Sequence, residues 1–344
     1  MITGASGYIG SCTVKELLEK AYTVRACVRD KNNAGKVQHL LDLAKGTPGT
    51  LELWEADLLK EGSFDAAAKG CDAVFHMASP FTLRFKDAQK DLIDPALQGT
   101  KNVLNSASRS GTVRKVILTS STVAVFGDNV DMKEKGLSEF TEADFNTTST
   151  LTHQPYAYSK VLAEKEAWKV AEAQNQWKLV VMNPGFVMGP MLSQISDSES
   201  LQFMKDMLGG KYRTGGADLY FGFVDVRDVA KAHRLALEND QAEGRFILCS
   251  STRGFMDVAD VIRKKYPGQF KLPLMKTPTF MLYFLGWMFG LTFKFIYRNV
   301  GHPVKINNGK SIRELGMTYI PFEKTITDMV DRMVSLNLTA RRGG

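Results

Sequence analysis

The chain has 344 residues, 44% of them apolar, which suits one large α/β domain with a smaller lobe and excludes a disordered chain. Its formal charge is +7, but basic and acidic residues are interleaved throughout, so we expect a phosphate-bearing small ligand and no nucleic-acid partner. The four cysteines form no C-x-x-C pair and the five histidines have no metal-ligand spacing, which predicts no metal and favours a reducing compartment, the cytoplasm. The first residues read as structure rather than as a signal peptide, although upstream residues, including a targeting peptide, could be missing.

A glycine-rich stretch near the start predicts a dinucleotide site. Gly4, Gly7 and Gly10 precede a helical pattern that runs from Ile9 to Lys20. Such a loop lets the backbone approach a pyrophosphate, which then lies at the positive end of the helix. An ordinary glycine turn is the alternative, and the strand-like stretch 22–29 that follows favours the dinucleotide site.

The end of that second strand predicts which dinucleotide is used. Arg29 stands at its terminal position, and Lys36 lies one helical turn into the next segment. Two cations there would bind the 2′-phosphate of NADP. The alternative is that Asp30 binds a ribose hydroxyl, which would favour NAD.

Strand and helix patterns then alternate as far as Gly185, which predicts a doubly wound parallel sheet. We expect a dinucleotide-binding domain at 1–190, rejoined by segments within about 221–250, and a substrate-binding lobe formed mainly by 191–344 and interleaved with it. The expected strands are 22–29, 51–55, 73–77, 116–120, 178–183 and 245–249, and the expected helices include 61–69, 87–108, 225–238 and 255–266. Asp57, after the third strand, is either an adenine contact or a helix cap.

The stretch 154–168 carries the chemistry. Tyr156 and Lys160 are four residues apart in a run of helix formers, so they should lie on one helix face. A cation beside a phenol favours phenolate and makes tyrosine a usable acid for carbonyl reduction. The spacing alone also occurs by chance on solvated helices. Ser120 and Ser121 end the fifth strand, where they are either catalytic hydroxyls or a plain strand terminus.

The segment 280–293 is intensely apolar, but its uncharged run is short for a bilayer crossing. We expect a buried or pocket-lining helix there, in preference to membrane contact. Gly286 and Gly290 would permit close helix packing.

Taken together, Thr3-Gly-Ala-Ser-Gly-Tyr-Ile-Gly10, Leu118-Thr-Ser-Ser121, Tyr156-x-x-x-Lys160 and Asn183-Pro-Gly-Phe-Val-Met-Gly-Pro190 resemble the extended short-chain dehydrogenase/reductases. The chain looks most like their dihydroflavonol-reductase and cinnamoyl-CoA-reductase branch, and segments 223–233 and 311–316 agree with it. The resemblance spans nearly the whole chain. It implies a Rossmann fold, NADPH as cofactor and a small-molecule carbonyl substrate, in a homodimer or a subunit of a larger assembly.

The resemblance also implies roles for matching residues. Ser121 would bind the substrate carbonyl, Tyr156 would donate the proton, and Lys160 would hold the nicotinamide ribose and lower the pKa of Tyr156. The remaining cofactor contacts would be Gly4, Ser6, Gly7, Tyr8, Ile9, Gly10, Arg29, Lys36, Asp57, Leu58, Met77, Ala78, Ser79, Pro184 and Val187.

Two departures from the branch bear on the substrate. Residues 153–160 read His-Gln-Pro-Tyr-Ala-Tyr-Ser-Lys, whereas cinnamoyl-CoA reductases carry an Asn-Trp-Tyr-Cys-Tyr-Gly-Lys block around the catalytic Tyr. Phe126 stands where dihydroflavonol reductases usually have Asn or Asp. Both argue for another aldehyde or ketone, in a pocket framed by Phe81, Phe126, Tyr158 and residues 188–191. A 3β-hydroxysteroid dehydrogenase with membrane contact through 280–293, and a non-catalytic NADP-binding subunit, are the alternatives.

Overall fold

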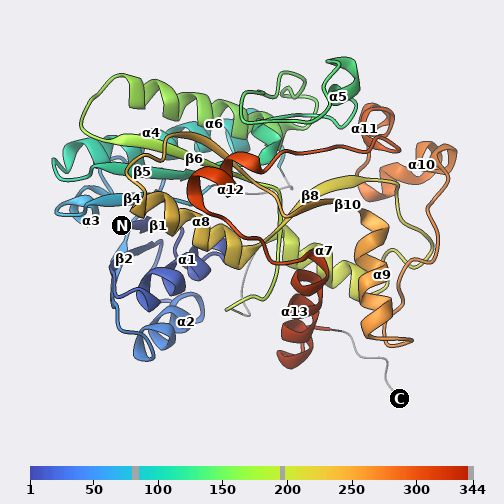
Figure 1. The fold of residues 1–344 in the computed structure, drawn as a ribbon, viewed down its shortest axis with the longest axis horizontal. Coiled ribbons are helices and arrows are strands. Elements are labelled where there is room, and N and C mark those ends of the chain that lie inside the picture. The colour runs from blue at the N-terminus through green and yellow to red at the C-terminus, as the bar shows by residue number, and fades with distance from the viewer. Residues whose placement is uncertain (80–84, 194–197, 340–344) are drawn as a thin grey trace.

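The computed structural model describes residues 1–79, 85–193 and 198–339, which form a seven-stranded sheet and a smaller three-stranded sheet (Figure 1). The large sheet has the order β3-β2-β1-β4-β5-β6-β9, and all neighbouring strands are parallel. Its strands are β1 (Ile2–Thr3), β2 (Thr23–Val28), β3 (Thr50–Glu55), β4 (Ala73–His76), β5 (Lys115–Thr119), β6 (Lys178–Pro184) and β9 (Gly244–Leu248). The Rossmann prediction is therefore confirmed.

The strand order reverses between β1 and β4, because β2 and β3 extend the sheet to one side and β4 to the other. At such a point, the crevice outside the carboxyl ends of the strands is the usual ligand site. β4 is buried at every residue, as expected for a strand covered by helices on both faces.

Two helix layers cover the large sheet (Figure 1). One contains α1 (Tyr8–Glu19), α2 (Ala34–Lys45) and α8 (Val226–Glu238), and the other contains α3 (Asp65–Ala68), α4 (Asp94–Arg109) and α6 (Pro155–Glu172). A π-helical turn, η1 (Gln89–Ile93), leads into α4, so the predicted helix 87–108 has two parts. The predicted helix 61–69 was too long: only α3 forms there, since Gly62 has a positive φ of 70°.

The smaller lobe is built on a sheet with the order β10-β8-β7. Its strands are β7 (Phe186–Met188), β8 (Tyr220–Asp225) and β10 (Ser251–Gly254). The helices outside the two layers are η2 (Thr122–Ala124), α5 (Asp131–Glu134), α7 (Glu199–Leu208), α9 (Phe255–Lys265), α10 (Thr279–Leu285), η3 (Gly286–Phe289), α11 (Phe293–Asn299), α12 (Gly309–Leu315) and α13 (Phe322–Ser335). β8 joins the small sheet, whereas α8 and β9 return to the large one, so the chain passes between the lobes several times.

The prediction of a buried helix at 280–293 was wrong. The segment is divided among α10, η3 and the start of α11. On its inner side Leu282 is buried, where it packs against Ile296 of α11. Gly290, with φ 75°, ends η3 in the left-handed conformation that interrupts the helix. None of the described helices has the length and apolar character needed to cross a bilayer.

Candidate active site

The glycine loop is shaped by close backbone contacts. Gly4 has φ 67°, and a Cβ there would lie 2.9 Å from the Ala78 backbone. A Cβ on Gly10 would lie 2.2 Å from the Gly4 carbonyl oxygen, so no larger residue fits there. α1 begins directly after the loop, with no side-chain cap and no acidic residue in its first turn. Its first N–H groups are therefore available to an anion, and the loop fits a dinucleotide pyrophosphate.

Not every residue of the loop offers its side chain to the crevice. The Tyr8 hydroxyl donates to the Gly189 carbonyl oxygen at 2.6 Å, and burial raises the pKa of this phenol. Ile9 packs against the core. The two residues can meet a cofactor through their backbone, while Ser6 and Gly7 line a small hollow with Leu192. Tyr8 thus tethers the loop to the chain beyond β7, a role that the glycine pattern could not predict.

The end of β2 carries the groups expected to select the dinucleotide. Arg29 is exposed, and among the described residues it has no ion-pair partner, so its guanidinium can receive a phosphate. Lys36 is half-buried in the first turn of α2. The Asp30 carboxylate accepts from the Asn32 backbone N–H at 2.9 Å, so it already closes a turn. This geometry fits a 2′-phosphate better than a ribose bound by Asp30.

Asp57 is an exposed residue of the turn after β3. Its carboxylate accepts from the Leu59 N–H at 2.9 Å, so it does not cap α3. Leu58 lies against Gly99 of α4, and its carbonyl accepts from Asn102. Leu58 lines the main pocket, and the structure leaves the adenine role of both residues a prediction.

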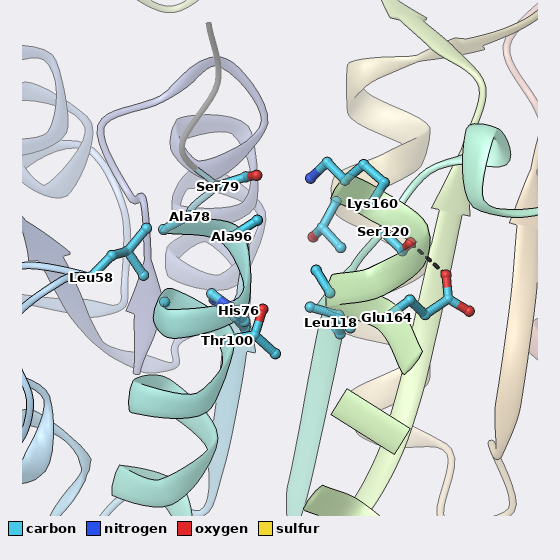
Figure 2. A pocket seen from close by; sticks show the side chains of 13 residues that line it. Leu58, His76, Ala78, Ser79, Ala96, Thr100, Leu118, Ser120, Lys160 and Glu164 are labelled. Carbon is cyan, nitrogen blue, oxygen red and sulfur yellow. Dashed lines mark hydrogen bonds between the residues drawn. The ribbon is translucent and has the colours of Figure 1, made fainter. Parts of the chain in front are cut away.

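Thr3 joins the ends of β1 and β4. Its hydroxyl lies 2.9 Å from His76 Nδ1 and accepts from the N–H groups of Met77 and Ala78. Burial, with a smaller effect of Lys160, lowers the pKa of His76 to about 3, so this histidine is neutral. These hydrogen bonds hold the chain directly after β4, where Ala78 and Ser79 line the pocket. Figure 2 shows the two residues at its wall. Sequence reasoning missed Thr3, because its partners come from a distant strand.

The main pocket lies between α4 and α6, at the carboxyl ends of β4 and β5. Ser79 and Ala78 lie on one side, and Lys160 and Ser120 lie on the other (Figure 2). Tyr156 is in the first turn of α6, and Lys160 follows one turn later, with Nζ 5.9 Å from the centre of the phenol ring. The helical spacing therefore brings the two groups together as the sequence predicted.

The expected effect of Lys160 on Tyr156 is not what the structure shows. Burial raises the pKa of Tyr156 well above its usual value, and the charge of Glu199 raises it further. Burial lowers the pKa of Lys160 to about 8, against an opposing effect of Glu164. The structure therefore moves the pKa of Tyr156 away from neutral pH, since burial disfavours the phenolate and the Lys160 ammonium lies 5.9 Å from the ring centre.

The two serines after β5 have different partners. The Ser120 hydroxyl donates to Glu164 Oε2 at 2.5 Å and lies at the pocket wall. The Ser121 hydroxyl accepts from the Val123 N–H at 3.3 Å and caps η2, and its side chain is half-buried. Ser121 therefore keeps its O–H proton for another acceptor, and its carbonyl-binding role stays a prediction.

Glu164 is a buried carboxylate that sequence reasoning missed. It lies one turn beyond Lys160 on α6, where it accepts from Ser120 and from Asn183 Nδ2 at 2.9 Å. Its other oxygen forms a 2.6 Å ion pair with Nε of Arg245 in β9. The Arg245 guanidinium also stacks 4.0 Å from the centre of the Phe145 ring. This cluster fixes α6 to three strands beneath the pocket.

A second buried carboxylate, Asp128, holds the start of α6. It accepts from His153 Nε2 at 2.9 Å and from Gln154 Nε2 at 2.6 Å, directly before the helix. From α11 it accepts from Arg298 at 2.6 Å and Asn299 at 2.7 Å. Gln154 has a left-handed backbone, with φ 55°, so these bonds stabilise a conformation that is unfavourable for a non-glycine residue.

The predicted frame of the substrate pocket needs a correction. Phe126 stacks on Phe140 at 4.3 Å and packs in a buried cluster with Ile247, so it belongs to the core. Phe81 lies outside the described residues. Tyr158 is half-buried. Pro184 ends β6 and Val187 lies in β7, and both are buried; their contact with a nicotinamide stays a prediction.

Among the residues that the structure describes, no group of three or more His, Cys, Asp and Glu side chains is arranged to hold a metal ion. The four cysteines are buried free thiols.

A dinucleotide-binding loop and a Tyr–Lys pair at one edge of a parallel sheet define the class, a nicotinamide-dependent oxidoreductase. The chain belongs to the NAD dependent epimerase/dehydratase family, whose model matches residues 1–249. It is 43% identical over 269 residues to cinnamoyl-CoA reductase CAD2 of Medicago truncatula, covering 77% of this chain and 80% of that protein. It is 37% identical over 275 residues to a bifunctional dihydroflavonol 4-reductase/flavanone 4-reductase of Malus domestica, covering 79% and 77%.

A similar solved structure is yeast methylglyoxal/isovaleraldehyde reductase Gre2 complexed with NADPH. The identity is 26%, the TM-score is 0.79, and 98% of each chain is covered. The dihydroflavonol-reductase and cinnamoyl-CoA-reductase branch indicated by the sequence is therefore confirmed.

Proposed function

We propose that this NADPH-dependent oxidoreductase reduces an aldehyde or a ketone to the alcohol, with Tyr156 as the proton donor. The observation that carries the proposal is the pairing of Tyr156 with Lys160 in the first two turns of α6, beside a pocket at the carboxyl edge of the sheet. Its relatives are named as reductases, and one acts on small aldehydes according to its name.

The cofactor and three side chains have separate roles in the reduction. Bound NADPH supplies the hydride, which reaches the carbonyl carbon. Ser121 donates a hydrogen bond to the carbonyl oxygen, and Tyr156 transfers its phenolic proton to the same oxygen, so the alcohol forms and a phenolate remains. The Lys160 ammonium stabilises that phenolate, which regains its proton from solvent. The raised pKa of Tyr156 keeps the donor protonated before the cofactor and substrate enter.

The substrate proposed is a free carbonyl compound rather than a CoA thioester. His153, which stands in the block that distinguishes the CoA reductases, is buried and bound to Asp128, so here it supports α6. The steroid alternative rests on the apolar segment 280–293, which bears on membrane contact and not on the substrate. Membership of a reductase branch leaves the non-catalytic alternative without support.

The test is NADPH consumption over a panel of aldehydes, ketones, a 3-oxosteroid and a CoA thioester. Tyr156→Phe should lower kcat by roughly 10²- to 10⁴-fold, because a positioned proton donor is lost. Tyr22→Phe is the matched control, since it removes a phenol near the opposite edge of the sheet, where Tyr22 binds Glu238. Turnover of the thioester alone, or an unchanged rate in Tyr156→Phe, would contradict the proposal.

The cofactor preference has a separate test. Arg29→Ala should raise KM for NADPH about tenfold or more, because an Arg–phosphate pair is lost, and should leave KM for NADH almost unchanged. An equal effect on both cofactors would assign Arg29 to the fold instead.

A further inference from the structure

The segment from Leu274 to Tyr297 presents an apolar surface that the fold does not cover. Among the described residues, eleven of the sixteen exposed large apolar side chains lie in this stretch. The most exposed are Leu274 at 79%, Phe284 and Trp287 at 74%, Phe293 at 70%, Tyr297 at 67% and Phe280 at 66%. Single exposed apolar residues are ordinary, whereas a group of this size indicates an interaction site. We call these eleven side chains the aromatic face.

The aromatic face is part of the folded lobe. Its inner side packs Leu282, Ile296 and Val300 into a small buried cluster. Tyr283 and Phe293 stack at 5.7 Å, which joins α10 to α11. One end of the segment is fixed by backbone hydrogen bonds of Gly216 with Met275 and Thr277, and the other by the hydrogen bond from Arg298 to Asp128. The exposed rings are therefore held outward by an ordered scaffold.

The part of the chain that carries the face is rich in basic residues. Residues 261–313 contain ten Lys and Arg and no Asp or Glu. Six of these cations pair with acids outside 261–313, as Lys276 does with Asp218. Lys294, beside Phe293 on α11, is exposed and has no ion pair among the described residues. An anionic partner would complement this surface.

We propose that the aromatic face docks the protein on the surface of a bilayer that contains anionic phospholipids. Phe, Trp and Met side chains would enter the boundary between headgroups and acyl chains, while Lys294 meets the lipid phosphates. The contact is peripheral, because α10 and α11 have seven residues each and neither can span a bilayer.

A lipid surface fits better than a second copy of the chain. A two-fold interface would place the same patch on both subunits. None of the eleven side chains of the face is acidic, so Lys294 would find no carboxylate within the face of the other copy. Anionic headgroups supply the missing negative charge at a surface that is apolar just below.

The experiment is flotation of the full chain with phosphatidylcholine vesicles that either contain or lack phosphatidylserine. We expect binding to the anionic vesicles, with a blue shift of Trp287 emission that Trp287→Phe abolishes. Phe284→Ser with Trp287→Ser should abolish flotation, and Lys294→Gln should weaken it about fivefold, the effect of one basic charge near the membrane.

Ile312→Ser and Lys20→Gln are matched controls from exposed sites outside the face, and both should float like the parent. Reductase turnover of the soluble variants shows that they are folded and separates this proposal from the catalytic one. A parent that stays unbound overturns the proposal, as does a Phe284/Trp287-dependent dimer, seen by light scattering, that does not bind vesicles.

Discussion

The helix that carries Tyr156 and Lys160 is held by two buried carboxylates, which differ in where their partners come from. Glu164 binds Ser120, Asn183 and Arg245, which lie on or directly after strands of the large sheet. Asp128 binds residues just before α6 together with Arg298 and Asn299 of α11, in the smaller lobe. The first cluster fixes the catalytic helix within its own domain, and the second ties its start to the lobe beyond.

The two clusters also differ in what the loss of the carboxylate would leave behind. Arg245 is buried, and Glu164 is its carboxylate partner among the described residues. Arg298 is partly exposed and also pairs with Asp131 and Glu134. An unpaired buried cation is much more costly than a partly solvated one that retains two carboxylates, so Glu164 should matter more for stability.

The largest expected effect is therefore that of Glu164→Ala. It should lower the free energy of unfolding by about 3–5 kcal/mol, because Arg245 would remain buried without its ion pair. Urea denaturation followed by circular dichroism measures the change. Glu166→Ala is the control on the same helix, since the pair of Glu166 with Lys101 is nearer the surface and its loss should cost less than about 1 kcal/mol. Similar losses in both variants would contradict the role of Glu164.

Asp128→Ala should have the next largest effect, a loss of about 1–3 kcal/mol from buried hydrogen bonds. It should also lower kcat, because Gln154 no longer holds the first turn of α6 at Tyr156. Steady-state kinetics and denaturation measure the two effects, and Asp260→Ala is an exposed control. A stability loss greater than that of Glu164→Ala would reverse the ranking of the two clusters.

The pH profile separates the clusters by their effect on Lys160. The pKa of Lys160 is about 8, so its ammonium is lost as the pH rises through that value. The kcat/KM for reduction should therefore fall near pH 8. Glu164→Gln should move this fall to lower pH by a few tenths to about one unit, because the negative charge of Glu164 favours the ammonium. Asp128→Asn should leave its position unchanged. Equal shifts in the two variants would mean that Glu164 acts through structure rather than charge.

The smallest expected effect is a change in the unfolding free energy at acidic pH. Burial alone raises the pKa of Asp128, but hydrogen bonds from Asn299, His153 and Arg298 outweigh burial and hold the pKa below its usual value of 3.8. The ionised group therefore adds stability above that value, and the contribution is lost as the pH falls through the lower pKa of the folded state. The difference in unfolding free energy between the parent and Asp128→Asn should be constant from pH 5 to 7 and shrink below about pH 4. A difference that stays constant down to pH 3 would exclude this titration.

The sequence predicted most of the large sheet and the pair at the centre of the site. Alternating apolar strands and amphipathic helices were found close to their expected positions, because their burial follows a short local period. Tyr156 and Lys160 share a helix face for the same reason. The apolar segment 280–293 was misjudged, since composition suggests burial but cannot reveal whether another part of the fold covers it.

What the sequence by itself determined is therefore local: the glycine loop, the alternation of strands and helices, and the Tyr–Lys spacing, each set by neighbours within a few residues. Tertiary structure decided the rest. Glu164 meets Arg245 only after β9 has joined β6, and Asp128 meets Arg298 only after the chain has returned from the smaller lobe. The pKa of Tyr156 was decided in the same way, because desolvation depends on everything packed around a group and not on the spacing of its neighbours along the chain.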